Sequence, residues 1–157
     1  MVNVYLPGMT GTEGERPDLA AMLGQLVRGL IAAERPVLAA HGVSMWGYVV
    51  LNALDRCPAS TQAALAKEIG ADKTRIIGTL DELQEAGLIA REPDPADRRA
   101  RLLHITESGS ALRAAVRDRI QANEDRLLAL LPAGQRQAFL RALGTLSELS
   151  EDEITGG

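Results

Sequence analysis

The amino-acid sequence predicts a mainly helical fold that carries one small β-hairpin. The chain has 157 residues, which fits one domain or one small domain with extensions. Apolar residues make up 46% and aromatic residues only 3%, so leucine, isoleucine, valine and alanine must build most of the core. Segments rich in alanine and leucine favour helices, and prolines and glycines fall mostly between them. Two short β-prone runs around an arginine-rich turn predict the hairpin.

Composition and charge restrict the function classes. The net charge of −4 taken alone argues against nucleic acid and membrane surfaces as partners, although a groove binder needs only a local basic patch. A single cysteine, Cys57, excludes an intrachain disulfide and indicates a reducing compartment. No apolar run approaches the roughly 18 residues of a membrane helix, and the first residues do not resemble a signal peptide. We therefore expect a cytoplasmic protein that makes no membrane contact.

The first part of the chain is predicted to be an arm followed by a long helix. Residues 1–16 show no helical period and form the arm. Asp18 can cap the helix that follows, Pro36 should kink or end it, and Gly42 closes the segment. One apolar helix face recurs at spacings of four, three and four residues. Its members are Leu19, Leu23, Leu26 and Leu30.

Two further helices are expected before the middle of the chain. Ser44 is the candidate N-cap of the first, which stops before Pro58. Ser60 is the candidate N-cap of the second, a short helix with Gly70 at its C′ position.

The next helix begins after Asp72 and ends at Gly87. The turn before it, residues 70–72, is tight because Gly70 can adopt a positive φ and Asp72 caps the incoming helix. Helical periodicity sends one face of this helix to the core. That face holds Ile76, Leu80 and Leu83.

Strands are predicted at 88–92 and 101–105, with a turn at 93–100. From Thr106 two helices close the chain, and Pro132 interrupts them. The tail from Ser150 is acidic and is expected to fray. The apolar stripe of the first closing helix is Leu112, Val116, Ile120, Leu127 and Leu131, and that of the second is Phe139, Leu143, Leu146 and Leu149.

Helix, tight turn, helix and hairpin in this order are the parts of a winged helix-turn-helix. In that arrangement the first helix crosses the DNA backbone and the second enters the major groove near its N-terminal end. Arg75 can pair with a guanine edge or a phosphate, and Ile77 can contact a thymine methyl group. Gly78 is either a defect costing about 1 kcal/mol relative to alanine or a device for close approach to the groove floor. The recognition-helix residues that DNA would meet are Lys73, Thr74, Arg75, Ile77 and Gly78, and Ser60, Thr61 and Gln62 are placed to hold phosphates.

The hairpin tip concentrates positive charge. Arg98, Arg99 and Arg101 can straddle the DNA backbone, and one arginine can enter the adjacent minor groove. Asp97 would repel phosphate if it were free, so we expect it to orient an arginine, Arg99 first. The alternative is a solvated basic loop with acidic neighbours, which is what charge runs usually are. The preceding helix pair favours the DNA-binding interpretation.

Residues 60–109 resemble the MarR family of transcriptional regulators. The resemblance rests on "TQAALAKEIG", "DKTRIIGTLDELQEAGLI", and the pattern Asp97-x-Arg99 followed by "LLHIT" and Gly109. It implies a homodimer whose winged helices read a pseudo-palindromic site on double-stranded DNA. Residues 17–43 and 107–157 would then form the dimerisation region and 44–106 the DNA-binding domain. Gly78 stands where many relatives carry a base-reading arginine, which shifts the expected contact to Arg75 and the wing.

The resemblance also implies a small aromatic or lipophilic effector bound between the dimer body and the winged helix. The candidate lining residues combine apolar surface with polar groups. The alternative is that Met45 and Trp46 are simply core residues. The candidates are His41, Met45, Trp46 and Tyr48.

Other chemistries receive little support. Cys57 is interpreted as a small buried residue rather than an oxidant sensor. No metal site or cofactor is predicted, because His41, His104 and Cys57 lie far apart in the sequence. No phosphate loop, metal motif or nucleophile elbow appears, so we do not expect an enzyme. The sequence predicts a ligand-responsive repressor; the alternative is a winged-helix protein-interaction or small-molecule-binding module without operator binding.

Overall fold

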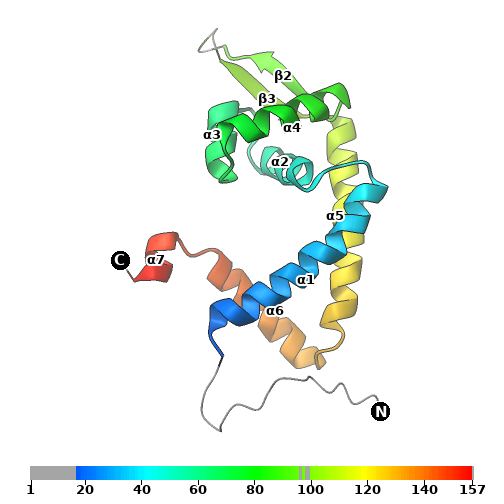
Figure 1. Cartoon of the computed structure of the whole chain (residues 1–157), viewed down its shortest axis with the longest axis vertical. Helices are drawn as coiled ribbons and strands as arrows, with labels where there is room; N and C mark the ends of the chain where they lie inside the picture. Colours follow the sequence, from blue (N-terminus) through cyan, green and yellow to red (C-terminus); the bar gives the residue numbers. More distant parts are fainter. Residues whose placement is uncertain (1–16, 96, 98–99, 157) are drawn as a thin grey trace.

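The computed structural model describes residues 17–95, 97 and 100–156, with only the backbone of Lys73 and Arg75. In Figure 1 α5 runs along the long axis and α1 crosses it obliquely, the β-hairpin projects at one end, and α6 lies towards the other. This confirms the predicted helical fold with a small β-wing. The elements in chain order are α1 (Leu19–Ala40), α2 (Met45–Arg56), β1 (Ser60–Thr61), α3 (Gln62–Glu68), α4 (Lys73–Glu85), β2 (Ile89–Pro93), β3 (Arg101–Ile105), α5 (Glu107–Leu128), α6 (Ala133–Ser147) and α7 (Glu151–Thr155).

The first helix continues past its internal proline, so of the two predicted effects of Pro36 only the kink stays a prediction. Pro36 does not end α1, which continues to Ala40. Proline removes the hydrogen bond to the carbonyl four residues earlier, that of Ala32. Both residues are exposed, so water can satisfy this carbonyl. Asp18 is the N-cap residue as predicted, but its side chain makes no capping hydrogen bond with the described chain.

The sheet contains a third strand that the sequence did not reveal. The described strands lie in the order β1-β3-β2 and pair antiparallel, with Ser60 opposite Leu103 and Arg91 also opposite Leu103. The prediction that Ser60 caps α3 is wrong. Thr61 is the cap, and its Oγ1 accepts a hydrogen bond from the Ala64 amide at 3.2 Å. Two residues are too short a run to show strand alternation.

The acidic tail also differs from expectation. It was predicted to fray, but residues 151–155 form α7. Ser150 and Glu153 form a capping box, in which each side chain accepts a hydrogen bond from the other residue's backbone. The hydrogen bonds from the backbone and side chain of Ser150 lower the pKa of Glu153. The pattern Ser-x-x-Glu was visible in the sequence and is the local cause of this short helix.

The core lies where the hairpin end of the molecule meets the upper ends of the two long helices. Ile76, Leu80 and Leu83 of α4 are buried, as the helical period predicted. α6 contributes no buried residue. Within the described residues no single helix is long and apolar enough to cross a membrane; α1 and α2 pass that test only together, with a bend of 88° between them. The buried cluster is Val37, Leu38, Val43, Val50, Leu51, Ala53, Leu54, Leu65, Ala66, Ile76, Leu80, Leu83, Leu88, Ile89, Leu103, Val116 and Ile120.

Candidate nucleic-acid interface

The helix-turn-helix forms at the predicted residues. Gly70 adopts a φ of +62°, and an Asp72 carboxylate oxygen accepts a hydrogen bond from the Thr74 amide at 2.7 Å, which starts α4. With one side of α4 buried, its opposite side faces outward and carries Thr74, Ile77 and Gly78. Ile77 is 44% exposed. The predicted contacts of the Lys73 and Arg75 side chains lie outside the described part of the chain.

Gly78 has no packing partner in the described chain. A Cβ atom built on it would meet nothing within 4 Å. Open space at this position fits both an exposed helix position and a surface free for a close ligand, so both interpretations of Gly78 stay predictions.

The start of α3 is already engaged within the chain. The Ser60 hydroxyl donates to the Cys57 carbonyl at 3.0 Å, so this proton is not available to a phosphate in this conformation. The Thr61 hydroxyl accepts from Ala64 and keeps its own proton for a further partner. Gln62 follows at the first position of α3 and is half-buried.

Backbone hydrogen bonds shape the wing tip. The Asp94 amide donates to the Ala100 carbonyl at 3.1 Å, and the Ala100 amide donates to the Asp97 carbonyl at 2.9 Å. Arg101 opens β3, opposite Pro93, and is exposed. The predicted residues Arg98 and Arg99 lie outside the described residues, and so does the expected contact of Asp97 with Arg99.

The base of the wing is hydrogen-bonded to Thr106, the residue that precedes α5. The Thr106 hydroxyl donates to the Gly87 carbonyl at 2.7 Å, and the Thr106 amide donates to the Leu88 carbonyl at 3.0 Å. Thr106 also caps α5 by accepting from the Gly109 amide. A Cβ atom on Gly109 would lie 2.0 Å from the Leu88 carbonyl oxygen, so this contact requires glycine. The glycine of the sequence motif therefore holds the wing against α5.

Arg91 makes a contact that sequence reasoning missed. Its guanidinium lies 2.7 Å from an Asp81 carboxylate oxygen and donates to the Gln84 side-chain oxygen at 2.9 Å. Asp81 lies on the outward face of α4, and this contact pairs its carboxylate with a cation. A signal was present, because Arg91 occupies the same side of β2 as the buried Ile89.

Of the four predicted effector residues, His41 lines a groove in the described chain, and Met45, Trp46 and Tyr48 are not among the residues that line it. His41 lines a groove of about 690 Å³ between the end of α1 and α5, and its Nδ1 hydrogen-bonds the Val37 carbonyl at 2.8 Å. Met45 and Tyr48 are partly buried against the core, whereas Trp46 is exposed. The core interpretation therefore fits Met45 but not Trp46. The groove is lined by Pro36, Val37, Ala40, His41, Ala115, Asp118, Arg119, Ala122 and Asn123.

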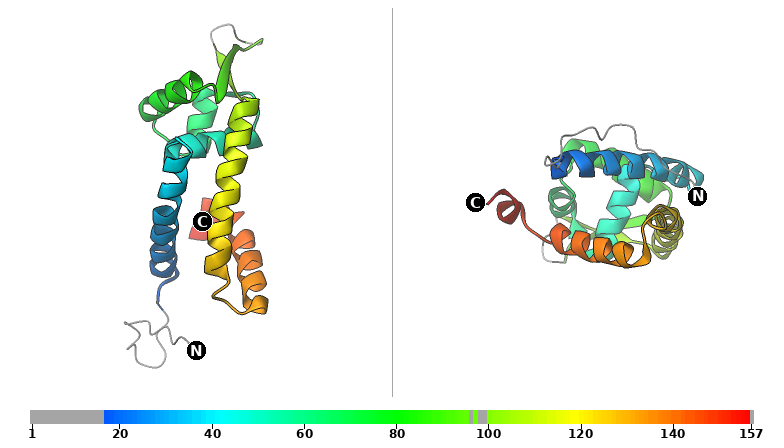
Figure 2. Two further views of the ribbon diagram at one scale, coloured as in Figure 1. Left: turned by 90° about the vertical axis from the view of Figure 1, so that its right-hand side faces the viewer. Right: turned by 90° about the horizontal axis from the view of Figure 1, so that it is seen from below.

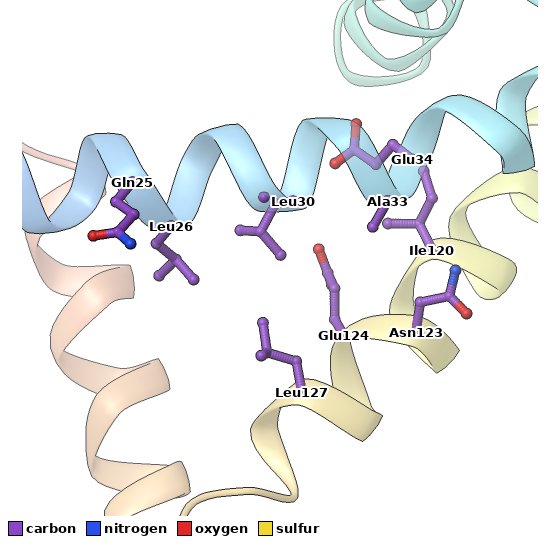
Figure 3. Close-up of a pocket in the computed structure, with 10 residues that line it drawn as sticks. Gln25, Leu26, Leu30, Ala33, Glu34, Ile120, Asn123, Glu124 and Leu127 are labelled. Atoms are coloured by element: carbon purple, nitrogen blue, oxygen red, sulfur yellow. The ribbon is translucent and has the colours of Figure 1, made fainter. Parts of the chain in front are cut away.

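A second cavity, of about 340 Å³, lies further along the same two helices. Leu26 and Leu30 of α1 face Leu127 of α5 across it (Figure 3). Glu34 and Glu124 also line it, and burial, followed by the charge of Glu124, raises the pKa of Glu34. The spacing of the leucines predicted these apolar helix faces. The proximity of Glu34 to Glu124 was not predicted, because it depends on the angle at which α1 and α5 cross.

Cys57 is exposed, and the prediction that it is buried is wrong. It follows the last residue of α2, and the next residues leave the core to enter β1. Ala59 in this connection has a φ of +63°, a conformation that non-glycine residues rarely adopt.

Comparison with known proteins gives a consistent result. The family model described as MarR family matches residues 41–100. A putative transcriptional regulatory protein for the hcr operon of Thauera aromatica is 31% identical over 134 residues, covering 82% of this chain and 81% of that protein. The transcriptional repressor NicR of Pseudomonas putida is 33% identical over 105 residues, covering 67% and 66%.

Solved structures agree with these relatives. The repressor CouR bound to a 23-mer DNA duplex has a TM-score of 0.69 and 28% identity, covering 83% of this chain and 93% of that one. A mutant of MarR from E. coli has a TM-score of 0.78 at 19% identity, covering 85% and 98%. The chain belongs to the MarR family of transcriptional regulators.

Proposed function

We propose that this regulator is a homodimeric cytoplasmic repressor that binds a pseudo-palindromic operator through α4 and the wing. The observation that carries the proposal is the two-sided character of α4. Its inner side is fixed in the core, and its outer side presents Thr74, Ile77 and Gly78 at the end of the molecule where the wing projects. A recognition helix needs this combination of a rigid base and an unoccupied face. The similar repressor CouR has been solved bound to a 23-mer DNA duplex, which supports duplex DNA as the partner.

Exposed apolar side chains support the homodimer. Apart from Trp46 and Ile77, the large exposed apolar residues of the described chain lie on α1, the end of α5, α6 and the segment through α7. These helices lie together, away from the wing (Figure 2). Exposed apolar side chains gathered on the helices at one end of a molecule indicate an interface, and a second copy offers the same side chains in a twofold arrangement. The residues are Leu19, Met22, Val27, Ile31, Leu127, Leu130, Leu140, Leu143, Leu146, Leu149 and Ile154.

The dimer is tested on α6. Leu140 and Leu143 share one side of this helix, and Leu140 is 48% exposed. The double variant Leu140→Glu, Leu143→Glu should weaken self-association at least 100-fold, measured by sedimentation equilibrium, while circular dichroism shows that the fold is retained. Ala138→Glu, on the opposite side of α6, is the control. A wild-type chain that sediments as a monomer at all concentrations, or a double variant that still dimerises like the wild type, would contradict the proposal.

DNA binding is tested with a duplex that the wild-type protein selects from a random-sequence pool. Arg101→Ala should lower the affinity and reduce the slope of log affinity against log salt by about 0.9, the value for one lost phosphate contact. Arg117→Ala on α5 removes the same charge away from the wing and should leave both unchanged. Failure to select any duplex would favour the alternative of a protein-interaction or small-molecule-binding module.

We also propose that a small aromatic or lipophilic effector, and first an aromatic carboxylate, releases the DNA from the groove at His41. This groove joins apolar side chains with Arg119, a partner for a carboxylate. Titration with benzoates and phenylacetates should release the selected duplex in the wild type and less effectively in Arg119→Ala. Equal release from both proteins would place the effector elsewhere.

A further inference from the structure

The outward face of α4 changes its electrostatic character along its length. Asp81 and Glu85 lie on the same side of the helix as Thr74 and Gly78. They follow Gly78 by about one and two helical turns. Asp81 is 59% exposed on this face. A free carboxylate here would meet the phosphates that flank the groove if α4 binds DNA as proposed, so this helix carries a repulsive group beside its own contact surface.

Arg91 of the neighbouring strand β2 forms an ion pair with the Asp81 carboxylate. The side chain of Arg91 is only 25% exposed, because it points to the same side of the strand as the buried Ile89 and lies opposite Leu103. Its stem is thus covered by the sheet's inner face, and its guanidinium emerges beside α4.

The contact is made at two points. One guanidinium nitrogen lies 2.7 Å from the Asp81 carboxylate, and the other donates to the Gln84 side-chain oxygen at 2.9 Å. Asp81 and Gln84 are three residues apart and therefore neighbours on the helix surface. A planar guanidinium held at two points fixes orientation as well as charge, which a lysine ammonium cannot do equally.

We propose that Arg91 is a positioning residue for DNA binding: it neutralises Asp81 and fixes β2 against the back half of α4, without contacting phosphate itself. This inference rests on the proposed DNA-binding function. In the intact pair the outward face of α4 presents no free charge at Asp81, and the wing keeps a constant angle to the recognition helix. Arg91 therefore acts through Asp81 and Gln84.

The test compares four proteins on the duplex selected by the wild type: Arg91→Ala, Asp81→Asn, the double variant Arg91→Ala, Asp81→Asn, and Arg91→Lys. Arg91→Ala should weaken binding at least tenfold at constant salt, because Asp81 is then unpaired. The double variant should recover at least threefold of that loss, and Arg91→Lys should fall between wild type and Arg91→Ala. The charge-matched control is Arg117→Ala, and thermal melts establish that each variant is folded at the assay temperature.

The salt dependence separates this role from a direct contact. If Arg91 acts through Asp81, the slope of log affinity against log salt stays at the wild-type value in Arg91→Ala. A slope reduced by about 0.9, with no recovery in the double variant, would show that Arg91 binds phosphate and would overturn the inference. Wild-type affinity in Arg91→Ala would overturn it as well. A wild-type protein that selects no duplex would instead remove the proposed function on which the inference rests.

Discussion

Two regions of the molecule differ in whether their apolar side chains are buried. One is the winged-helix region, residues 45–105. The other is the set of terminal helices, which comprises α1, the end of α5, α6 and α7. In the winged-helix region Leu51, Leu54, Leu65 and Leu80 are fully buried. In the terminal helices Leu146 is 50% exposed, and α6 has no buried residue. Both regions contain helices whose apolar residues recur at helical spacing, so this periodicity alone does not distinguish them.

This difference shows which part of the described chain buries its own apolar side chains. The winged-helix region has its own core, closed by the upper ends of α1 and α5 through Val37, Leu38, Val116 and Ile120. The terminal helices have apolar faces that the described chain leaves uncovered. A second copy would supply the missing cover, which agrees with the proposed dimer.

The largest expected effect tests how tightly the winged-helix region is packed. Gly109→Ala places a methyl group 2.0 Å from the Leu88 carbonyl oxygen and should cost about 3 kcal/mol of stability in urea unfolding. Gly134→Ala on α6, where a methyl group meets nothing within 4 Å of the described chain, should be neutral or slightly stabilising. If both variants change the free energy of unfolding by the same amount, the two regions do not differ in how tightly they are packed.

The next effect concerns the link between the winged-helix region and the first part of α5, which leads to the terminal helices. Arg113 of α5 lies 2.8 Å from the Asp55 carboxylate of α2, and the arginine side chain is 14% exposed. Asp55→Ala should cost about 2 kcal/mol, because it leaves a mostly buried cation without its partner. Adding Arg113→Met should restore most of that stability. A loss of stability under about 0.5 kcal/mol in the single variant would mean that this ion pair does not stabilise the packing of α2 against α5.

A smaller effect lies at the strained connection in the winged-helix region. Ala59→Gly should stabilise the protein by about 1 kcal/mol, because glycine adopts the φ of +63° without steric cost. Ala64→Gly, in α3, is the control and should destabilise by about 1 kcal/mol. Chemical denaturation of both variants measures the opposite signs, and a destabilised Ala59→Gly would contradict the prediction.

The smallest effect belongs to the terminal helices. Burial and Glu124 raise the pKa of Glu34, so its ionisation costs stability as the pH rises through that raised pKa. Glu34→Gln should therefore melt at a higher temperature than wild type near pH 7, and the difference should vanish in acid, where Glu34 is protonated. Melts across this range, with the exposed Glu148→Gln as control, measure the change. A difference independent of pH would exclude this cause.

Local patterns predicted much of the fold and part of the candidate site. The periodicity of Ile76, Leu80 and Leu83 identified the inner side of α4, and Asp72 and Gly70 identified the turn before it. The contact between Arg91 and Asp81 was not predicted, because it joins residues on two elements whose relative angle no local pattern encodes. The exposure of Cys57 was missed for a related reason, since burial depends on what packs over a helix end.

The sequence by itself determined the order of the long helices and the hairpin, the caps Ser44 and Asp72, and the sides of the helices that are apolar, because these depend on interactions within a few residues. Only the tertiary structure decided which apolar sides are covered, how Gly109 meets Leu88, and which acid Arg91 neutralises. Those outcomes depend on the angles and distances at which separate elements pack. Apolar helix faces with the same residue spacing are therefore buried in the core of one region and exposed in the other.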